Sequence, residues 1–288
     1  ETRVSDVYGN PAVQSSSITV NLDQGGIAFN PVTGDNYINA QEATADVVLS
    51  GTTANVAEGA TLALTFDGLS YTTTVGAGGS WSITLPAADV ATLPDGDVPL
   101  TATVTDLGGT EITQTLDIGV HITTLPAPVL NTPLGDGFLS AAAAGQDQYL
   151  SGATGISGDG QTVLVTLGNF TYNARVNNDG SWTATLPAAD LQTLPEGSTP
   201  IVVAASDIAG NTVTTTSALT VDFTAPALTV ADVATDNALN AAEVQQPFSL
   251  SGTAPAGEAG QTVTATLNSV SYTTAVLADG TWSLSIPA

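Results

Sequence analysis

The chain has 288 residues, of which 42% are hydrophobic, and its 27 acidic residues against two Lys or Arg give a formal charge of −25. Because such a charge repels phosphates, the composition excludes binding to nucleic acid or to an anionic membrane surface. The absence of Cys excludes disulfides and thiol, iron–sulfur or Cys-ligated zinc chemistry. No apolar run approaches the roughly 20 residues that cross a bilayer. The length suits two or three domains of about 100 residues.

The first 20 residues match a stretch near the end of a later part of the chain. The segment SDVYGNPAVQSSSITV from Ser5 is similar to SDIAGNTVTTTSALTV from Ser206. Both contain an Asp-containing turn with Gly-Asn, followed by a Thr- and Ser-rich segment of strand-forming residues. We therefore expect residues 1–20 to be the C-terminal strands of a preceding module.

A domain-sized repeat follows. The tryptophans Trp81, Trp182 and Trp282 stand 101 and then 100 residues apart, each in a related stretch such as YNARVNNDGSWTATLPAAD from Tyr172. Each repeat predicts about seven short strands separated by turn residues, the pattern of an immunoglobulin-like sandwich. The predicted fold class is all-β, with tandem immunoglobulin-like β-sandwich modules of about 100 residues arranged as an elongated string. The expected modules are residues 21–120, 121–221 and 222–288, the last without its closing strands.

Around each Trp, apolar and polar residues alternate on both sides of a turn, as at Val176, Gly180 and Trp182. Period-two alternation across a turn predicts a β-hairpin with one buried face. We expect each Trp to anchor a core, with ligand stacking as the alternative. The PAAD segments come next, and their acids Asp89 and Asp190 are interpreted as helix N-caps or turn formers.

Acidic and amide side chains gather where one module is expected to end and the next to begin. They come from the closing turn, the linker and the next module's first loop, where the pattern Asp-Asn-x-(Ile/Leu)-Asn-x-x-Glu occurs twice. Calcium takes about six to eight oxygen ligands, and with so few Lys or Arg a divalent cation is the efficient way to hold carboxylates together. The alternative is that these residues are turn formers and solvated loop residues. The predicted calcium ligands are Asp6, Asn21, Asp23, Asp35, Asn39 and Glu42 around residue 21, and Asp207, Asp222, Asp236, Asn240 and Glu243 around residue 222.

The boundary near residue 121 departs from this pattern. Asp106 and Asp136 remain, but His121 stands where the other linkers have Asn or Asp. Ser140 and Ala143 replace the Asn and the Glu of the loop. We expect this junction to bind calcium weakly or not at all.

No residue pattern predicts catalysis. His121 is the only histidine and has no partner motif for a catalytic triad or a metal site. The sequence contains no GxSxG, HExxH or GxxxxGK pattern and no Lys. We therefore predict that the chain is not an enzyme and interpret His121 as an exposed linker residue.

Several segments resemble the tandem bacterial immunoglobulin-like repeats of giant surface adhesins exported by type I secretion, the long non-fimbrial and RTX-type adhesins. The resemblance covers essentially the whole chain and is carried by LPAADLQTLPEG from Leu186, SDIAGN from Ser206, VDFTAP from Val221, DNALNAAE from Asp236 and SYTTAVLADGTWSLSIPA from Ser271. It implies extender modules that hold a terminal ligand-binding region away from the cell, with calcium stiffening the junctions. The ligands that it supports are Asp6, Asp35, Asn39, Glu42, Asp207, Asp222, Asp236, Asn240 and Glu243.

The sequence thus predicts a non-catalytic, extracellular extender of a long bacterial cell-surface adhesin that supports cell adhesion or biofilm formation. The expected partners are neighbouring modules of the same chain, and host or surface ligands bound through other regions of the parent protein. One alternative is a module that itself recognises glycan or protein through its loops. A further possibility is self-association, in which residues 1–20 of one chain complete the open third module of another by strand addition.

Overall fold

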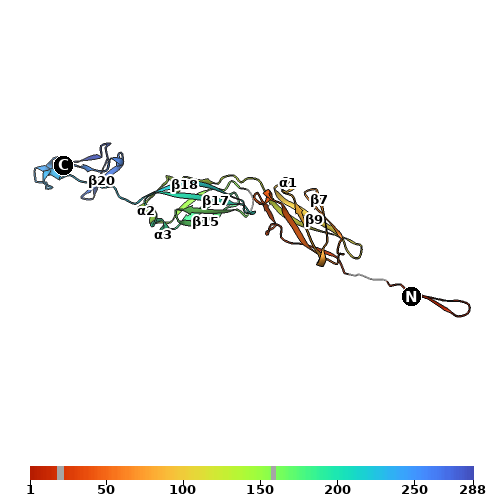
Figure 1. The fold of residues 1–288 in the computed structure, drawn as a ribbon. Helices are drawn as coiled ribbons and strands as arrows, with labels where there is room; N and C mark the ends of the chain where they lie inside the picture. The colour runs from red at the N-terminus through yellow and green to blue at the C-terminus, as the bar shows by residue number, and fades with distance from the viewer. Residues whose placement is uncertain (18–22, 157–159) are drawn as a thin grey trace. The chain divides into compact units, whose positions relative to one another are not determined.

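The computed structural model describes residues 1–17, 23–156 and 160–288. Contacts between residues divide the chain into two units, one of residues 1–138 and 143–220 and the other of residues 139–142 and 221–288. In the described part of the chain, every helix is too short or too polar to span a bilayer. Figure 1 shows that strands make up most of the regular structure.

An isolated hairpin begins the chain. Its strands β1 (Thr2–Ser5) and β2 (Pro11–Gln14) pair antiparallel, with Arg3 opposite Val13. Every residue of both strands is exposed. The hairpin therefore has no core of its own.

The first module is a sandwich of a three-stranded sheet, in the order β3-β5-β8, and a five-stranded sheet, in the order β4-β10-β9-β6-β7. Its core contains Leu49 and Trp81 from the first sheet and Leu64 and Leu100 from the second. Its strands are β3 (Gly26–Phe29), β4 (Tyr37–Asn39), β5 (Val47–Ala54), β6 (Thr61–Phe66), β7 (Leu69–Thr74), β8 (Ser80–Leu85), β9 (Gly96–Thr105) and β10 (Glu111–His121). Its short helices are η1 (Glu42–Thr44), η2 (Ala77–Gly79) and α1 (Ala87–Val90).

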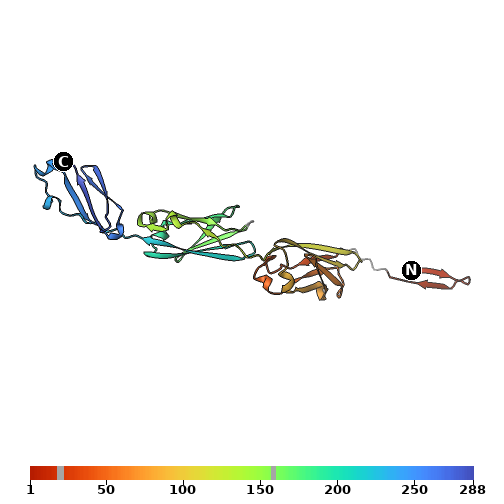
Figure 2. The same cartoon turned by 90° about the horizontal axis from the view of Figure 1, so that it is seen from above.

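The second module repeats this architecture. Its strands form one sheet in the order β11-β13-β16-β15-β14-β17-β18-β12, which folds into two layers (Figure 2). Trp182, Leu150, Val165 and Val203 are buried between these layers. Its strands are β11 (Val129–Leu130), β12 (Phe138–Ser140), β13 (Gln148–Ala153), β14 (Thr162–Leu167), β15 (Phe170–Val176), β16 (Ser181–Leu186), β17 (Gly197–Ser206) and β18 (Thr212–Asp222). Its helices are η3 (Pro133–Gly135), α2 (Ala141–Ala144) and α3 (Ala188–Leu191).

The third module has two pairs of strands, β19 with β22 and β20 with β21, which correspond in sequence to β13 to β16 of the second module. Val263, Val276 and Trp282 form its core cluster. Its strands are β19 (Phe248–Thr253), β20 (Thr262–Leu267), β21 (Val270–Ala275) and β22 (Thr281–Ile286), and its helices are η4 (Val233–Thr235), η5 (Glu243–Gln245) and η6 (Ala256–Glu258).

The three tryptophans anchor the cores, as the alternation predicted. Trp81, Trp182 and Trp282 are 3%, 1% and 3% exposed. Opposite Trp81, on the neighbouring strand β5, stands Gly51. A Cβ on Gly51 would lie 2.6 Å from the indole ring and 2.0 Å from the carbonyl oxygen of Ala28, so no side chain fits there. The repeated Ser-Gly pair therefore marks the place where ring and backbone approach most closely.

The predicted hairpin around the Trp is wrong for the first module. β7, which carries Tyr71, lies in the five-stranded sheet, whereas β8, which carries Trp81, pairs with β5 in the other sheet. In the second module β15 and β16 share only two residue pairs, the second of which joins Val176 to Trp182. The turn therefore carries the chain from one layer of the sandwich to the other.

The tyrosine of this segment is tied to the PAAD helix. The Tyr71 hydroxyl donates a hydrogen bond of 2.8 Å to Asp89, and the Tyr172 hydroxyl donates one of 3.0 Å to Asp190. Burial, together with the bond to Asp89, raises the pKa of Tyr71 to about 12. Both tyrosines therefore stay neutral donors over the whole physiological pH range.

Asp89 and Asp190 are not the N-caps that the sequence suggested. The N–H at the start of α1, on Ala87, donates instead to Asp46 at 2.9 Å. The N–H of Ala188 at the start of α3 donates to Asp147, also at 2.9 Å. In the first and second modules, the acid just before a sheet strand thus caps a helix that lies about 40 residues further along the chain.

Candidate functional site

The predicted calcium ligands fall at opposite ends of the modules. Asp207 precedes β18 and Asp222 ends it, and an 11-residue strand separates its ends by roughly 33 Å. The Asp106 turn likewise precedes β10, and His121 ends it. The prediction that a closing turn shares one site with the linker that follows it is therefore wrong. The closing turn lies at the start of the last strand, and the linker lies at the end of that strand.

Asp23 lies at the Asp106 end of the first module. The N–H of Gly25 donates to Asp106 Oδ2 at 3.4 Å. The side-chain amide of Asn55 donates to the carbonyl oxygen of Asp23 at 2.5 Å. This end brings linker and closing turn together, whereas Asn21 lies outside the described residues.

The loop of the first module lies at the opposite end, because β4 pairs in parallel with the last residues of β10 and places Asn39 beside His121. Asp35 Oδ1 accepts the N–H of Tyr37 at 2.9 Å. The N–H of Asn39 donates to Glu42 Oε2 at 3.0 Å, and the N–H of Glu42 donates to Asn39 Oδ1 at 2.9 Å. This reciprocal pattern is a capping box for η1. The repeated Asn-x-x-Glu pattern therefore has a local structural role.

The third module has the same capping box. The N–H of Asn240 donates to Glu243 Oε2 at 2.8 Å, and the N–H of Glu243 donates to Asn240 Oδ1 at 3.2 Å. Asp236 and Asp222 each accept the N–H of the residue two positions further on, at 3.0 Å in both cases. The acidic loops are thus ordered by bonds within themselves.

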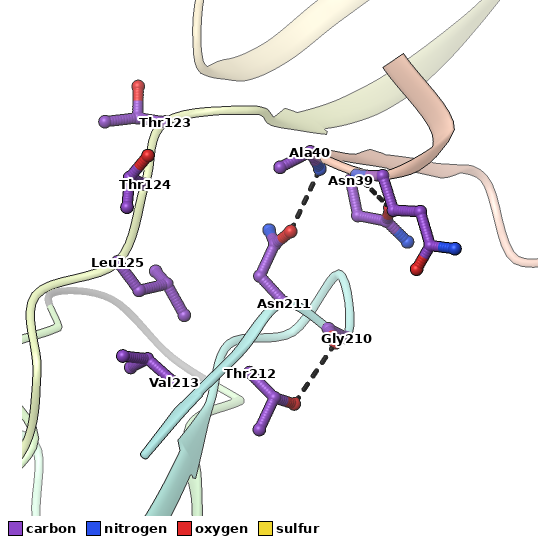
Figure 3. Close-up of a pocket in the computed structure, with 10 residues that line it drawn as sticks. Asn39, Ala40, Thr123, Thr124, Leu125, Gly210, Asn211, Thr212 and Val213 are labelled. Atoms are coloured by element: carbon purple, nitrogen blue, oxygen red, sulfur yellow. Dashed lines mark hydrogen bonds between the residues drawn. The ribbon is translucent and has the colours of Figure 1, made fainter. Parts of the chain in front are cut away.

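The first module's loop meets the closing turn of the second module, within one compact unit (Figure 3). Asn211 Nδ2 donates to Asp207 Oδ2 at 2.8 Å and to the carbonyl oxygen of His121 at 2.7 Å. Its Oδ1 accepts the N–H of Ala40 at 2.9 Å. A cleft of about 530 Å³ beside these bonds is lined by Asn39, Ala40, Gln41, Thr123, Thr124, Leu125, Gly210, Asn211, Thr212 and Val213.

Two carboxylates flank the linker between these modules. Asp207 is only 8% exposed, and the His121 Nδ1 lies 3.8 Å from its Oδ2, a pair that is ionic only when the imidazole is protonated. Asp95 accepts the N–H of Ile122 at 2.8 Å and that of Thr123 at 3.3 Å. Burial alone would raise the pKa of Asp95, but these hydrogen bonds and the nearby imidazole hold it below its ordinary value.

The junction has the oxygen atoms that calcium prefers, but N–H donors of the protein already bind them. Both oxygens of Asp207 accept bonds from Asn211. One oxygen of Glu42 and the amide oxygen of Asn39 belong to the capping box. Across residues 1–17, 23–156 and 160–288, no three Asp, Glu or His side chains form a group that could hold a metal ion. What sets this junction apart is His121, which stands where the other linkers have Asn21 and Asp222, so an imidazole replaces one oxygen ligand here.

Asn211 and Asp95 were not among the predicted site residues. Asn211 ends the repeated Ser-Asp-x-x-Gly-Asn turn, so its recurrence at Asn10 was a signal in the sequence. Asp95 follows a Leu-Pro pair, as Glu196 does one repeat later. Neither signal says which module end the residue occupies, because that depends on the direction of the strand next to it.

Comparison with known proteins identifies the family. Residues 150–223 match the model of the bacterial Ig-like domain. One solved structure, described as a Ca²⁺-stabilized adhesin that helps an Antarctic bacterium reach out and bind ice, is 32% identical. It covers 99% of this chain and 72% of its own, with a TM-score of 0.43. A search of curated proteins gave no match.

Two further solved structures are similar. One, described in connection with host cell surface retention of a 1.5-MDa bacterial ice-binding adhesin, is 30% identical over 92% of this chain and 87% of its own, with a TM-score of 0.44. The other is a bacterial immunoglobulin-like domain of the M. primoryensis ice-binding adhesin. It is 35% identical over 33% of this chain and 94% of its own, with a TM-score of 0.27. The sequence identity over nearly the whole chain, together with the family match, shows that the chain belongs to the tandem bacterial immunoglobulin-like repeats of giant adhesins.

Proposed function

We propose that this chain lengthens and stiffens a bacterial surface adhesin, through modules bounded near residues 21, 121 and 222. The family consists of structural repeats and not of enzymes, so the chain is a non-catalytic adhesin spacer. The observation that carries the stiffening is the direct bonding of the Ala40 loop to the Asn211 turn. Two modules that share such bonds resist bending at their junction.

Calcium is proposed at module ends other than the His121 junction. The similar adhesin described as Ca²⁺-stabilized supports a role for the ion in this family. At one end Asp23, with Asn21 near it in sequence, and the Asp106 turn would contribute ligands. The other proposed ligands are Asp6, Asp222, Asp236, Asn240 and Glu243. An ion bound there would offset the repulsion among carboxylates in a chain of charge −25.

A location outside the cell follows from the same proposal. Adhesins act at the cell surface, and extracellular calcium modules bind the ion at roughly 10⁻⁴–10⁻³ M. Export by type I secretion and a contribution to biofilm formation are proposed on the resemblance of the sequence. The absence of Cys fits a protein that folds without disulfides after export.

The test is calcium titration of the full chain, by calorimetry and thermal unfolding, with small-angle X-ray scattering in calcium and in excess chelator. We expect binding in the range above, a higher melting temperature and a better defined maximum dimension in calcium. The double variant Asp236→Asn, Glu243→Gln should lose part of the heat and of the stabilisation. The control Glu111→Gln, Asp117→Asn removes the same charge from the exposed side of β10 and should not. Absence of any calcium effect on the parent chain would refute the calcium proposal.

A further inference from the structure

The Asn211 side chain binds three segments of the chain at once. A side-chain amide has two N–H donors and one oxygen acceptor. Both donors are used, one on Asp207 in its own turn and one on the carbonyl oxygen of His121 in the linker. The oxygen accepts the N–H of Ala40 from the first module. One residue thus joins loop, linker and closing turn, and Figure 3 shows its bond to Ala40.

A second asparagine makes the contact reciprocal. Asn39 Nδ2 donates to the carbonyl oxygen of Ala209 at 3.2 Å, while its Oδ1 holds the first turn of η1. Each module therefore contributes one asparagine that binds the backbone of the other. Each asparagine binds a backbone group, Ala40 N–H or Ala209 C=O, that lies one or two residues from the other asparagine. The contact therefore depends on both loops keeping their conformation.

Both loops are ordered without the contact. In the isolated N-terminal hairpin, Asp6 accepts the N–H of Tyr8, the N–H of Asn10 and the Asn10 side-chain amide, each at 2.9 Å. This is the pattern that Asp207 and Asn211 form in the second module. The capping box also recurs in the third module. Preordered halves lose less conformational entropy when they join.

We infer that the first and second modules are joined by a hydrogen-bonded clasp of Asn39 and Asn211, which takes the place of a bound cation at this junction. The inference rests on the spacer function proposed above. Asp207 is only 8% exposed, and the imidazole of His121 lies 3.8 Å from the Asp207 oxygen that accepts the Asn211 amide. Asp6 accepts the same kind of bond from Asn10, but it is exposed. Calcium is therefore neither needed nor accommodated here.

The clasp can form only between a module whose loop has the Asn39 residue and a module whose closing turn has the Asn211 residue. The turn of the first module has Thr110 where the second has Asn211, and the loop of the second has Ser140 where the first has Asn39. A hydroxyl has one donor and cannot make the two amide bonds of Asn211. The junction at residue 121, whose two halves both lie in this sequence, combines both asparagines.

The test measures the distance between the two modules by pulsed spin-label spectroscopy on the full chain. Because the chain has no Cys, Gln114→Cys on β10 and Thr216→Cys on β18 place one label on an exposed site of each module. The parent should give a narrow distance distribution that is the same in calcium and in excess chelator. The variant Asn211→Ala should broaden it by about a factor of two or more as undocked conformers become populated.

Two more variants separate the clasp from general damage to the fold. Ala40→Pro removes the N–H that Asn211 accepts, and proline suits the position after the capping Asn39, so the second module stays untouched and the distribution should still broaden. Asn177→Ala, in an exposed hairpin of the second module, should leave it narrow.

Broadening of the parent on chelation would overturn the inference, because a cation would then hold the junction. So would a narrow distribution in both Asn211→Ala and Ala40→Pro. Either result is independent of the calcium titration of the other module ends, which tests the proposed function.

Discussion

Gly51→Ala is the sharpest test of how the sandwich is packed. The change adds one methyl group to β5, a strand that already contains Ala54. That methyl would lie 2.0 Å from the Ala28 carbonyl oxygen and 2.6 Å from the Trp81 ring. The first obstacle is the backbone of the paired strand β3, and the second is the largest side chain of the core.

The cost follows from what must move. Overpacking a core costs about 1–3 kcal/mol when side chains can adjust, but here the nearest obstacle is a backbone carbonyl. The clash is relieved either by parting β3 from β5 or by displacing Trp81, and loss of a buried Trp costs about 3–5 kcal/mol. We expect a destabilisation of about 3 kcal/mol or more. For a module of this size, each kcal/mol lowers the melting temperature by about 4–8 °C.

Gly26→Ala is the matched control, since it lies on β3 of the same sheet and a Cβ added to it would have no atom within 4 Å. It should be neutral or stabilising by up to about 1 kcal/mol. Hydrogen exchange read by mass spectrometry separates the modules, with peptides from β5 and β8 reporting the first and peptides from β13 and β16 serving as reference. Equal exchange of the β5 peptide in Gly51→Ala and Gly26→Ala would refute the packing argument.

Two further predictions concern pH. The pKa of Tyr71 is raised from 10.0 to about 12, so between these values the unfolded chain loses a proton that the folded chain keeps, and the first module should lose stability as the pH rises. Tyr71→Phe should remove this dependence of the urea midpoint, and a midpoint that falls equally in both proteins would contradict it. The pKa of Asp95 lies below its ordinary 3.8, so its contribution is present above that value and is lost as the pH falls below it. Asp95→Asn should flatten the acid side of the unfolding profile, whereas an unchanged acid limb would show that Asp95 contributes nothing.

The sequence predicts the division into modules and the buried face of each strand. The spacing of Trp81, Trp182 and Trp282 gives the repeat, and alternation along each strand gives the buried face. The partner strand could not be predicted in the same way, because alternation says which side chains point inward and nothing about which sheet a strand joins. In a sandwich, consecutive strands such as β7 and β8 can belong to different layers.

The candidate site failed in prediction for a related reason. Asp207 and Asp222 are 15 positions apart, and proximity in the sequence suggested one site. The strand between them is extended, so they stand at opposite ends of the module. The elements that meet at the 121 junction, the Asn39 loop and the Asn211 turn, are about 170 residues apart. Only the strand directions, which the fold supplies, bring them together.

These strand directions also explain how one chain can set the stiffness of each junction separately. In a module the loop lies at the end of its last strand and the closing turn at the start of it. A loop of one module can therefore bind the turn of the next, in a head-to-tail contact that does not close on itself. Such a contact can repeat along a tandem chain. Whether a given junction forms this contact depends on two positions, those of Asn39 and Asn211. The second module has Ser140 at the first position, and the first module has Thr110 at the second. Junctions with both asparagines are held by the protein itself, and those without them depend on their carboxylates and on the cations in the medium.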